Sequence, residues 1–170
     1  YMVVKFMDYV PEISDKAMIH PSATIIGRCE IAEGVSIWPG VVIRGDVDMI
    51  EIGKNSNLPD NSVFHPNLNR PVIIGENVTV GHSAVVHGSV IGNNCLIGMN
   101  ATVIESEIGE NCLIGAGCLI TPNSKIPPNS LVLGLPFKVV KQLSDDEIKS
   151  LKNSADEYLE LAKIYDWSKK

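Results

Sequence analysis

The fold of this chain is decided by a six-residue period, clearest in Ile91-Gly92-Asn93-Asn94-Cys95-Leu96-Ile97-Gly98-Met99-Asn100-Ala101-Thr102-Val103. An aliphatic residue opens each step, and glycine often follows it. A period of six places successive aliphatic residues on different faces of a 3.6-residue helix, which excludes an amphipathic helix. Short strands joined by tight turns are consistent with the period, because glycine and asparagine adopt the positive φ angles that corners need.

The same period extends through most of the chain. The recurring apolar residues are Ile19, Ile25, Ile31, Ile37, Ile43, Ile52, Leu58, Phe64, Ile74, Val80, Val86, Ile91, Ile97, Val103, Ile108, Ile114, Ile120 and Ile126. The frame is interrupted after Ile43, shortened by one residue after Val86 and Val103, and looped out between Pro66 and Val72. Such a repeat is the signature of a solenoid. Three hexads form one triangular coil, so the sequence predicts an all-β solenoid of about six coils.

The chain divides into three segments of a single domain. Residues 1–16 lack the repeat and are predicted to form an extended lead-in, and residues 17–136 form the solenoid. The run Ser144-Asp145-Asp146-Glu147 is a capping box. Apolar residues then recur at helical spacing, which predicts a C-terminal helix over residues 144–166, packed on the solenoid.

The composition indicates an interior with few aromatic side chains. Hydrophobic residues make up 45% of the 170 residues, but aromatic residues only 5%. Small and β-branched side chains must therefore fill the core. All four cysteines, Cys29, Cys95, Cys112 and Cys118, lie four residues after an aliphatic position. This shared register predicts buried packing residues rather than disulfide or metal ligands.

Charge and hydropathy limit the partners. A net charge of -6 argues against nucleic acid, which needs a basic patch. No apolar run approaches the roughly 20 residues that cross a bilayer, so no membrane partner is expected. No signal peptide opens the chain, which favours the cytoplasm.

Three histidines stand out in the repeat. His65 directly follows Phe64 and His87 directly follows Val86, three hexads apart, so their side chains are expected to stack in adjacent coils. Two stacked imidazoles can share a metal ion. His82 lies one face away, so a three-histidine site needs His82 from a neighbouring subunit. A closed ring of such sites is most simply a homotrimer.

Charged residues accompany the histidines. Arg44 occupies the column of His65 and His87 one coil earlier, in the run Arg44-Gly45-Asp46. A buried ion pair that holds the interface is expected there. Asp60 is predicted to stack beneath His82.

These residues resemble the gamma-class carbonic anhydrase family of hexapeptide-repeat proteins. The resemblance covers roughly residues 19–165 and rests on Arg44-Gly45-Asp46, on Asp60-Asn61 followed by His65, and on Gly81-His82 followed by His87. It implies a left-handed parallel β-helix, a homotrimer, and zinc, iron or cobalt at the subunit interfaces. The metal ligands would be His65 and His87 of one subunit and His82 of the next. The resemblance also implies an intersubunit ion pair of Arg44 with Asp46, and catalytic roles for Asn57 and Asp60.

The sequence departs from the family pattern at three positions. Pro59 stands where members commonly carry glutamine, so a polar side chain beside the metal is lost. Val47 and Leu68 stand where the best-characterised type has glutamates that are thought to shuttle protons. The first hypothesis is nevertheless reversible hydration of CO2 to bicarbonate by a metal-bound hydroxide, with slow or buffer-dependent turnover.

Two other functions remain open on the sequence. Many hexapeptide-repeat proteins transfer an acyl group from acyl-coenzyme A, with one histidine as general base. The chain can also be a non-catalytic scaffold or binding protein that is stabilised by the metal.

Overall fold

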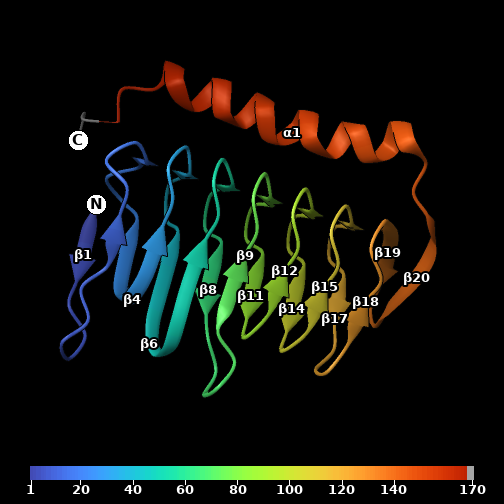
Figure 1. Ribbon diagram of the computed structural model, residues 1–170, viewed down its shortest axis with the longest axis horizontal. Coiled ribbons are helices and arrows are strands. Elements are labelled where there is room, and N and C mark those ends of the chain that lie inside the picture. Colours follow the sequence, from blue (N-terminus) through green and yellow to red (C-terminus); the bar gives the residue numbers. More distant parts are fainter. Residues whose placement is uncertain (168–170) are drawn as a thin grey trace.

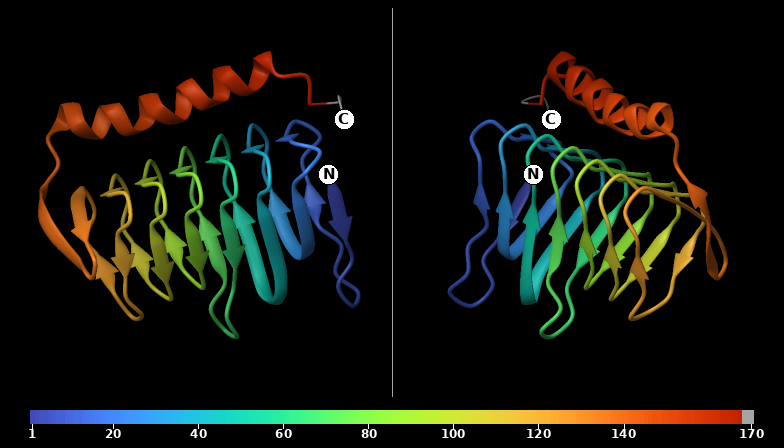
Figure 2. Two further views of the ribbon diagram at one scale, coloured as in Figure 1. Left: turned by 180° about the vertical axis from the view of Figure 1, so that it is seen from behind. Right: turned by 45° about the vertical axis from the view of Figure 1, so that its right-hand side comes forward.

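The protein is a left-handed parallel β-helix of about seven turns with a single C-terminal α-helix. The computed structural model describes residues 1–167. The helix runs back along the whole stack of coils, from the C-terminal end towards the N-terminal end (Figure 1). Two further directions of view show the same triangular stack with the helix beside one edge (Figure 2). The predicted fold class, an all-β solenoid of hexapeptide repeats, is confirmed.

The strands form two hydrogen-bonded sheets that wrap around three faces. One sheet continues through the long strand β6 onto two faces, in the order β17-β14-β11-β8-β6-β9-β12-β15-β18. Its strands are β1 (Met2–Val4), β2 (Glu12–Ile13), β4 (Thr24–Ile31), β6 (Val42–Ile52), β8 (Val63–His65), β9 (Val72–Ile74), β11 (Val85–His87), β12 (Val90–Ile91), β14 (Thr102–Ile104), β15 (Glu107–Ile108), β17 (Leu119–Ile120) and β18 (Lys125–Ile126). The third face consists of β3 (Met18–Ile19), β5 (Ser36–Ile37), β7 (Asn57–Leu58), β10 (Thr79–Val80), β13 (Leu96–Ile97), β16 (Leu113–Ile114), β19 (Ser130–Gly134) and β20 (Phe137–Gln142).

The core is a set of stacked aliphatic rows. Parallel pairing aligns each repeat with its counterpart one coil on, as in Ile97 with Ile114. The recurring apolar residue of every hexad is at most 4% exposed in its coil. All four cysteines are buried and free, as predicted. Cys95 and Cys112 donate through Sγ to the carbonyls of Gly109 and Pro127, at 3.1 and 3.2 Å, so the thiols bind backbone at the inner corners.

The corners depend on asparagine. Nine non-glycine corner residues with positive φ lie three residues after an aliphatic position, namely Asn55, Asn61, Asn77, Ser83, Asn94, Asn100, Asn111, Asn123 and Asn129. Asparagine tolerates this left-handed conformation better than most residues. In the two shortened hexads the left-handed residue comes only two positions after the aliphatic one. These residues are Gly88 and Glu105, with φ of 53° and 42°.

The N-terminal segment takes part in the solenoid. β1 pairs with Thr24–Ile26 and β2 pairs with Glu30 and Ile31, both in parallel. Residues 2–13 therefore add a coil that the repeat does not mark, which raises the count from the expected six to about seven.

The C-terminal segment closes the stack and turns back. β19 and β20 form an antiparallel hairpin that leads into α1 (Asp145–Ile164). Ser144 and Glu147 form the predicted capping box. At the far end of the helix, Tyr158 and Tyr165 pack edge-on against Trp38, which is 5% exposed. Within residues 1–167, no helix is long and apolar enough to cross a membrane.

Replacing Ser144 with alanine is expected to weaken the helix by about 1 kcal/mol, because the Glu147 N–H then loses its acceptor. Chemical unfolding at fixed protein concentration measures the change. Asn153→Ala, in the middle of the same helix and exposed, is the matched control and should stabilise the helix slightly, because alanine has the higher helix propensity. Equal effects of the two substitutions would show that the cap contributes nothing specific.

Candidate metal centre

The two sequence-predicted histidines of one column lie side by side. β8 and β11 pair in parallel with His65 opposite His87. Their ring centroids are 5.3 Å apart, and the planes are tilted by 42°. Phe64 and Val86, the residues just before them, point inward and are fully buried, so both imidazoles point outward. The pleat of the strand thus places two imidazoles on one outer edge.

Arg44 and Asp46 lie next to this pair. Ile43 is opposite Phe64, so Arg44 continues the column of the histidines. Asp46 accepts a hydrogen bond from His65 Nε2 at 2.8 Å and forms an ion pair with Arg44 of the same chain. Burial raises the pKa of the Asp46 carboxyl, but hydrogen bonds from the Val47 N–H, His65 and Arg44 outweigh burial and leave the pKa below its ordinary value. Asp46 is therefore a charged acceptor that occupies one nitrogen of His65.

His82 lies on another face. It follows β10 in the sheet of the third face, whereas His65 and His87 belong to the other sheet. Its Nδ1 lies 3.1 Å from Asp60 Oδ2. A carboxylate at Nδ1 holds the proton there and leaves the Nε2 lone pair available. The His82 side chain is 46% exposed, so a second molecule can reach it.

Tyr158 lines a cavity together with His82, and Asn57 lies next to Thr79 of the same lining. Asn57 is buried and donates from Nδ2 to Thr79 Oγ1 at 3.0 Å, while its Oδ1 is buried without a hydrogen-bond partner among the described residues. A buried acceptor without a donor suggests an ordered water or a ligand. Burial raises the pKa of the Tyr158 hydroxyl, and the nearby negative charge of Asp60 raises it further.

The three histidines of one chain do not come together. Among residues 1–167, no group of three or more His, Cys, Asp or Glu side chains is arranged to hold a metal ion. One chain brings together His65 and His87 and keeps His82 apart. The chain thus carries two imidazoles on one edge and a third on another face.

Sequence reasoning did not identify Tyr158 or Glu105 near these residues. Tyr158 belongs to α1, and the helical spacing of its apolar residues does not indicate which coil of the solenoid each residue lies beside. Glu105 did leave a signal, because the corner of its shortened hexad carries glutamate where the preceding one carries Gly88.

A β-helix of hexapeptide repeats with histidines stacked on one outer edge defines the class of this protein. The family model "Bacterial transferase hexapeptide (six repeats)" matches residues 11–45, 71–105 and 89–122. The chain is 49% identical to a probable carbonic anhydrase of Methanocaldococcus jannaschii, over 88% of this chain and 95% of the relative. It is 38% identical to the mitochondrial gamma carbonic anhydrase 1 of Arabidopsis thaliana, over 96% of this chain. The chain thus belongs to the gamma carbonic anhydrase-like family of hexapeptide-repeat proteins.

Other relatives carry other names. The match with the Arabidopsis protein spans 62% of that protein's length, so the chain covers about three-fifths of it. A solved structure of a putative acetyltransferase from Bacillus cereus superimposes with a TM-score of 0.94 at 36% identity, over 96% of each chain. The fold is therefore shared by proteins described with two different chemistries.

Proposed function

We propose that this chain is a subunit of a homotrimeric metalloenzyme that reversibly hydrates CO2 to bicarbonate. The metal is held between copies, by His65 and His87 of one and His82 of the next. The observation that carries the proposal is the division of the histidines, with two stacked imidazoles on one edge and one half-exposed imidazole on another face. The similarity to carbonic anhydrases supports the reaction.

The surrounding residues have distinct roles in this proposal. Asp60 keeps the proton on Nδ1 of His82, so that Nε2 faces the neighbouring copy. On assembly, Asp46 forms its ion pair with Arg44 of the adjacent copy instead of Arg44 of its own chain. The hydrogen bond between Asp46 and His65 Nε2 then breaks, so that Nε2 can bind the metal. The buried oxygen of Asn57 accepts a hydrogen bond from a water or from bicarbonate. Zinc, iron or cobalt bound to three imidazoles acts as a Lewis acid that activates water at neutral pH.

Proton removal is expected to limit the rate. Val47 and Leu68 flank the histidine edge, are 43% and 68% exposed, and carry no ionisable group. We therefore expect CO2 hydration that is slow at low buffer and rises with buffer concentration. Stopped-flow measurement on the metal-loaded oligomer tests this expectation. A rate equal to background at every buffer concentration, with one metal per chain, would refute the proposed reaction and favour a metal-stabilised scaffold.

Acyl transfer from an acyl-coenzyme A is the second candidate. It is favoured by the similarity to the putative acetyltransferase and by an open, mainly apolar cavity of about 400 Å³ beside His82. In that case His82 acts as general base, with Asp60 orienting it. Titration calorimetry with coenzyme A distinguishes the two candidates, because an acyltransferase is expected to bind coenzyme A and a carbonic anhydrase is not.

A further inference from the structure

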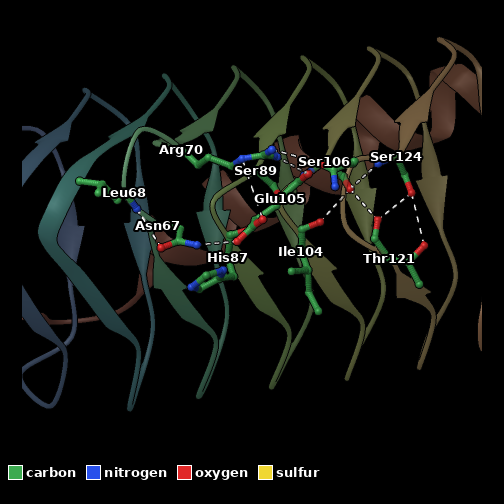
Figure 3. A network of polar contacts seen from close by, with 11 residues as sticks. Asn67, Leu68, Arg70, His87, Ser89, Ile104, Glu105, Ser106, Thr121 and Ser124 are labelled. Atoms are coloured by element: carbon green, nitrogen blue, oxygen red, sulfur yellow. Dashed lines mark hydrogen bonds and ion pairs between the residues drawn. The ribbon is translucent and has the colours of Figure 1, made fainter.

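The loop after His65 is fastened to two later coils. Between β8 and β9 the repeat is interrupted, and Asn67 and Arg70 close a tight turn through two backbone hydrogen bonds of 3.0 and 2.9 Å. Both of their side chains reach out of the turn towards Glu105 (Figure 3). The loop begins directly after a proposed metal ligand, so its position affects His65.

Glu105 has an unfavourable backbone conformation. Its φ of 42° is in the left-handed region, which disfavours residues other than glycine and asparagine. Gly88 has the same corner position one coil earlier. A Cβ on Gly88 would lie 3.2 Å from Glu105 Cγ. Because Gly88 has no side chain, the Glu105 side chain has room to pass over it. The solenoid itself does not need glutamate at this corner.

The contacts of Glu105 account for it. Its Oε1 accepts a hydrogen bond from Asn67 Nδ2 at 2.6 Å, and its carbonyl accepts one from Arg70 Nη1 at 3.1 Å. Arg70 Nε lies 3.9 Å from Glu105 Oε2, and Nη2 donates to Asn123 Oδ1 at 2.7 Å. The Glu105 side chain is only 21% exposed, so these interactions are partly shielded from water.

The same residue is attached to the second histidine. The Glu105 N–H donates to the carbonyl of His87 at 2.7 Å, and the Gly88 N–H donates to the carbonyl of His65 at 2.9 Å. Glu105 thus connects the backbone of His87 with the loop that follows His65. We call Glu105, Arg70 and Asn67 the latch.

We propose that the latch positions His65 relative to His87 for metal binding, with Glu105 as its central positioning residue. The inference rests on the proposed function, in which these two histidines share a metal. Two ligands on separate coils bind a metal more tightly when their spacing is fixed before the metal arrives. The six residues 66–71 form an irregular loop, and Glu105 and Arg70 attach it to the regular coils.

Glu105→Gly separates this role from simple stabilisation. Glycine removes the carboxylate but adopts the left-handed corner more easily, so the metal-free protein is expected to melt no lower than wild type. The zinc dissociation constant, measured by chelator competition on the assembled oligomer, is expected to rise roughly 10-fold to 100-fold. The visible spectrum of the cobalt-substituted protein should change as well, because it reports ligand geometry.

Asn77→Gly is the matched control. Asn77 is a left-handed corner with φ of 54° whose N–H donates to the carbonyl of Lys54 rather than to the latch, and its substitution should leave zinc affinity unchanged. Arg70→Gln is a second variant, which keeps Glu105 and should weaken zinc binding in the same direction. Wild-type zinc affinity in Glu105→Gly would overturn the latch, as would a fall in the melting temperature of the metal-free variant. A wild-type protein that binds no metal would instead refute the proposed function itself.

Discussion

Replacing His82 with alanine is expected to release the metal from the purified oligomer. His82 is the only one of the three histidines on its face, and Asp60 binds its Nδ1, while its Nε2 has no partner among residues 1–167. Losing a ligand costs more than losing a hydrogen-bond partner of a ligand, which alone costs about 10-fold to 100-fold in affinity. We expect the metal affinity to fall by at least about 100-fold. Elemental analysis after dialysis, together with mass in solution, measures the result.

Mixing two defective chains tests whether the site is shared. Chains with His82→Ala keep the stacked pair, and chains with His65→Ala and His87→Ala keep only His82. In a mixed trimer, one interface brings an intact pair together with an intact His82, so metal binding and CO2 hydration should return in part. A site contained within one chain would not be restored. Retention of the metal by the His82→Ala protein alone would contradict the shared site directly.

The solenoid could be predicted because its side-chain directions are set locally. In each hexad the aliphatic residue points inward, and the residue after it points outward. This rule alone placed His65 opposite His87, and the structure confirms their alignment. It also identified the cysteines as core residues and Asn77, Asn100 and Asn111 as corners, which all have positive φ.

The sequence did not reveal the particular contacts between residues of different coils. The first coil was missed because only Met2–Val4 and Glu12–Ile13 pair, and they carry no repeated spacing. The latch was missed because Asn67 and Glu105 are 38 residues apart. They meet only because the loop after His65 folds back and the following coil has a glycine at its corner. Such contacts depend on the path of the backbone, which a residue pattern does not specify.

Phe64→Ala is expected to have the largest effect on stability. Phe64 is fully buried and lies between Ile43 and Val86 of the adjacent coils. The other hexads carry an aliphatic residue at this position, so the ring fills a volume that alanine leaves empty. Truncation of a buried phenylalanine to alanine costs about 3–5 kcal/mol. Denaturant unfolding at fixed protein concentration should show a lower midpoint with an unchanged slope.

Phe64→Leu is the control, because it restores the aliphatic residue of the repeat and should cost less than about 1.5 kcal/mol. The comparison also bears on the metal, since Phe64 immediately precedes His65. A cavity at position 64 lets β8 shift inward, which alters the spacing of His65 and His87. Zinc affinity should therefore fall in Phe64→Ala even under conditions where the protein is folded. If Phe64→Ala is as stable as Phe64→Leu, the coils collapse around the cavity. If its zinc affinity is unchanged, the core does not set the spacing of the histidines.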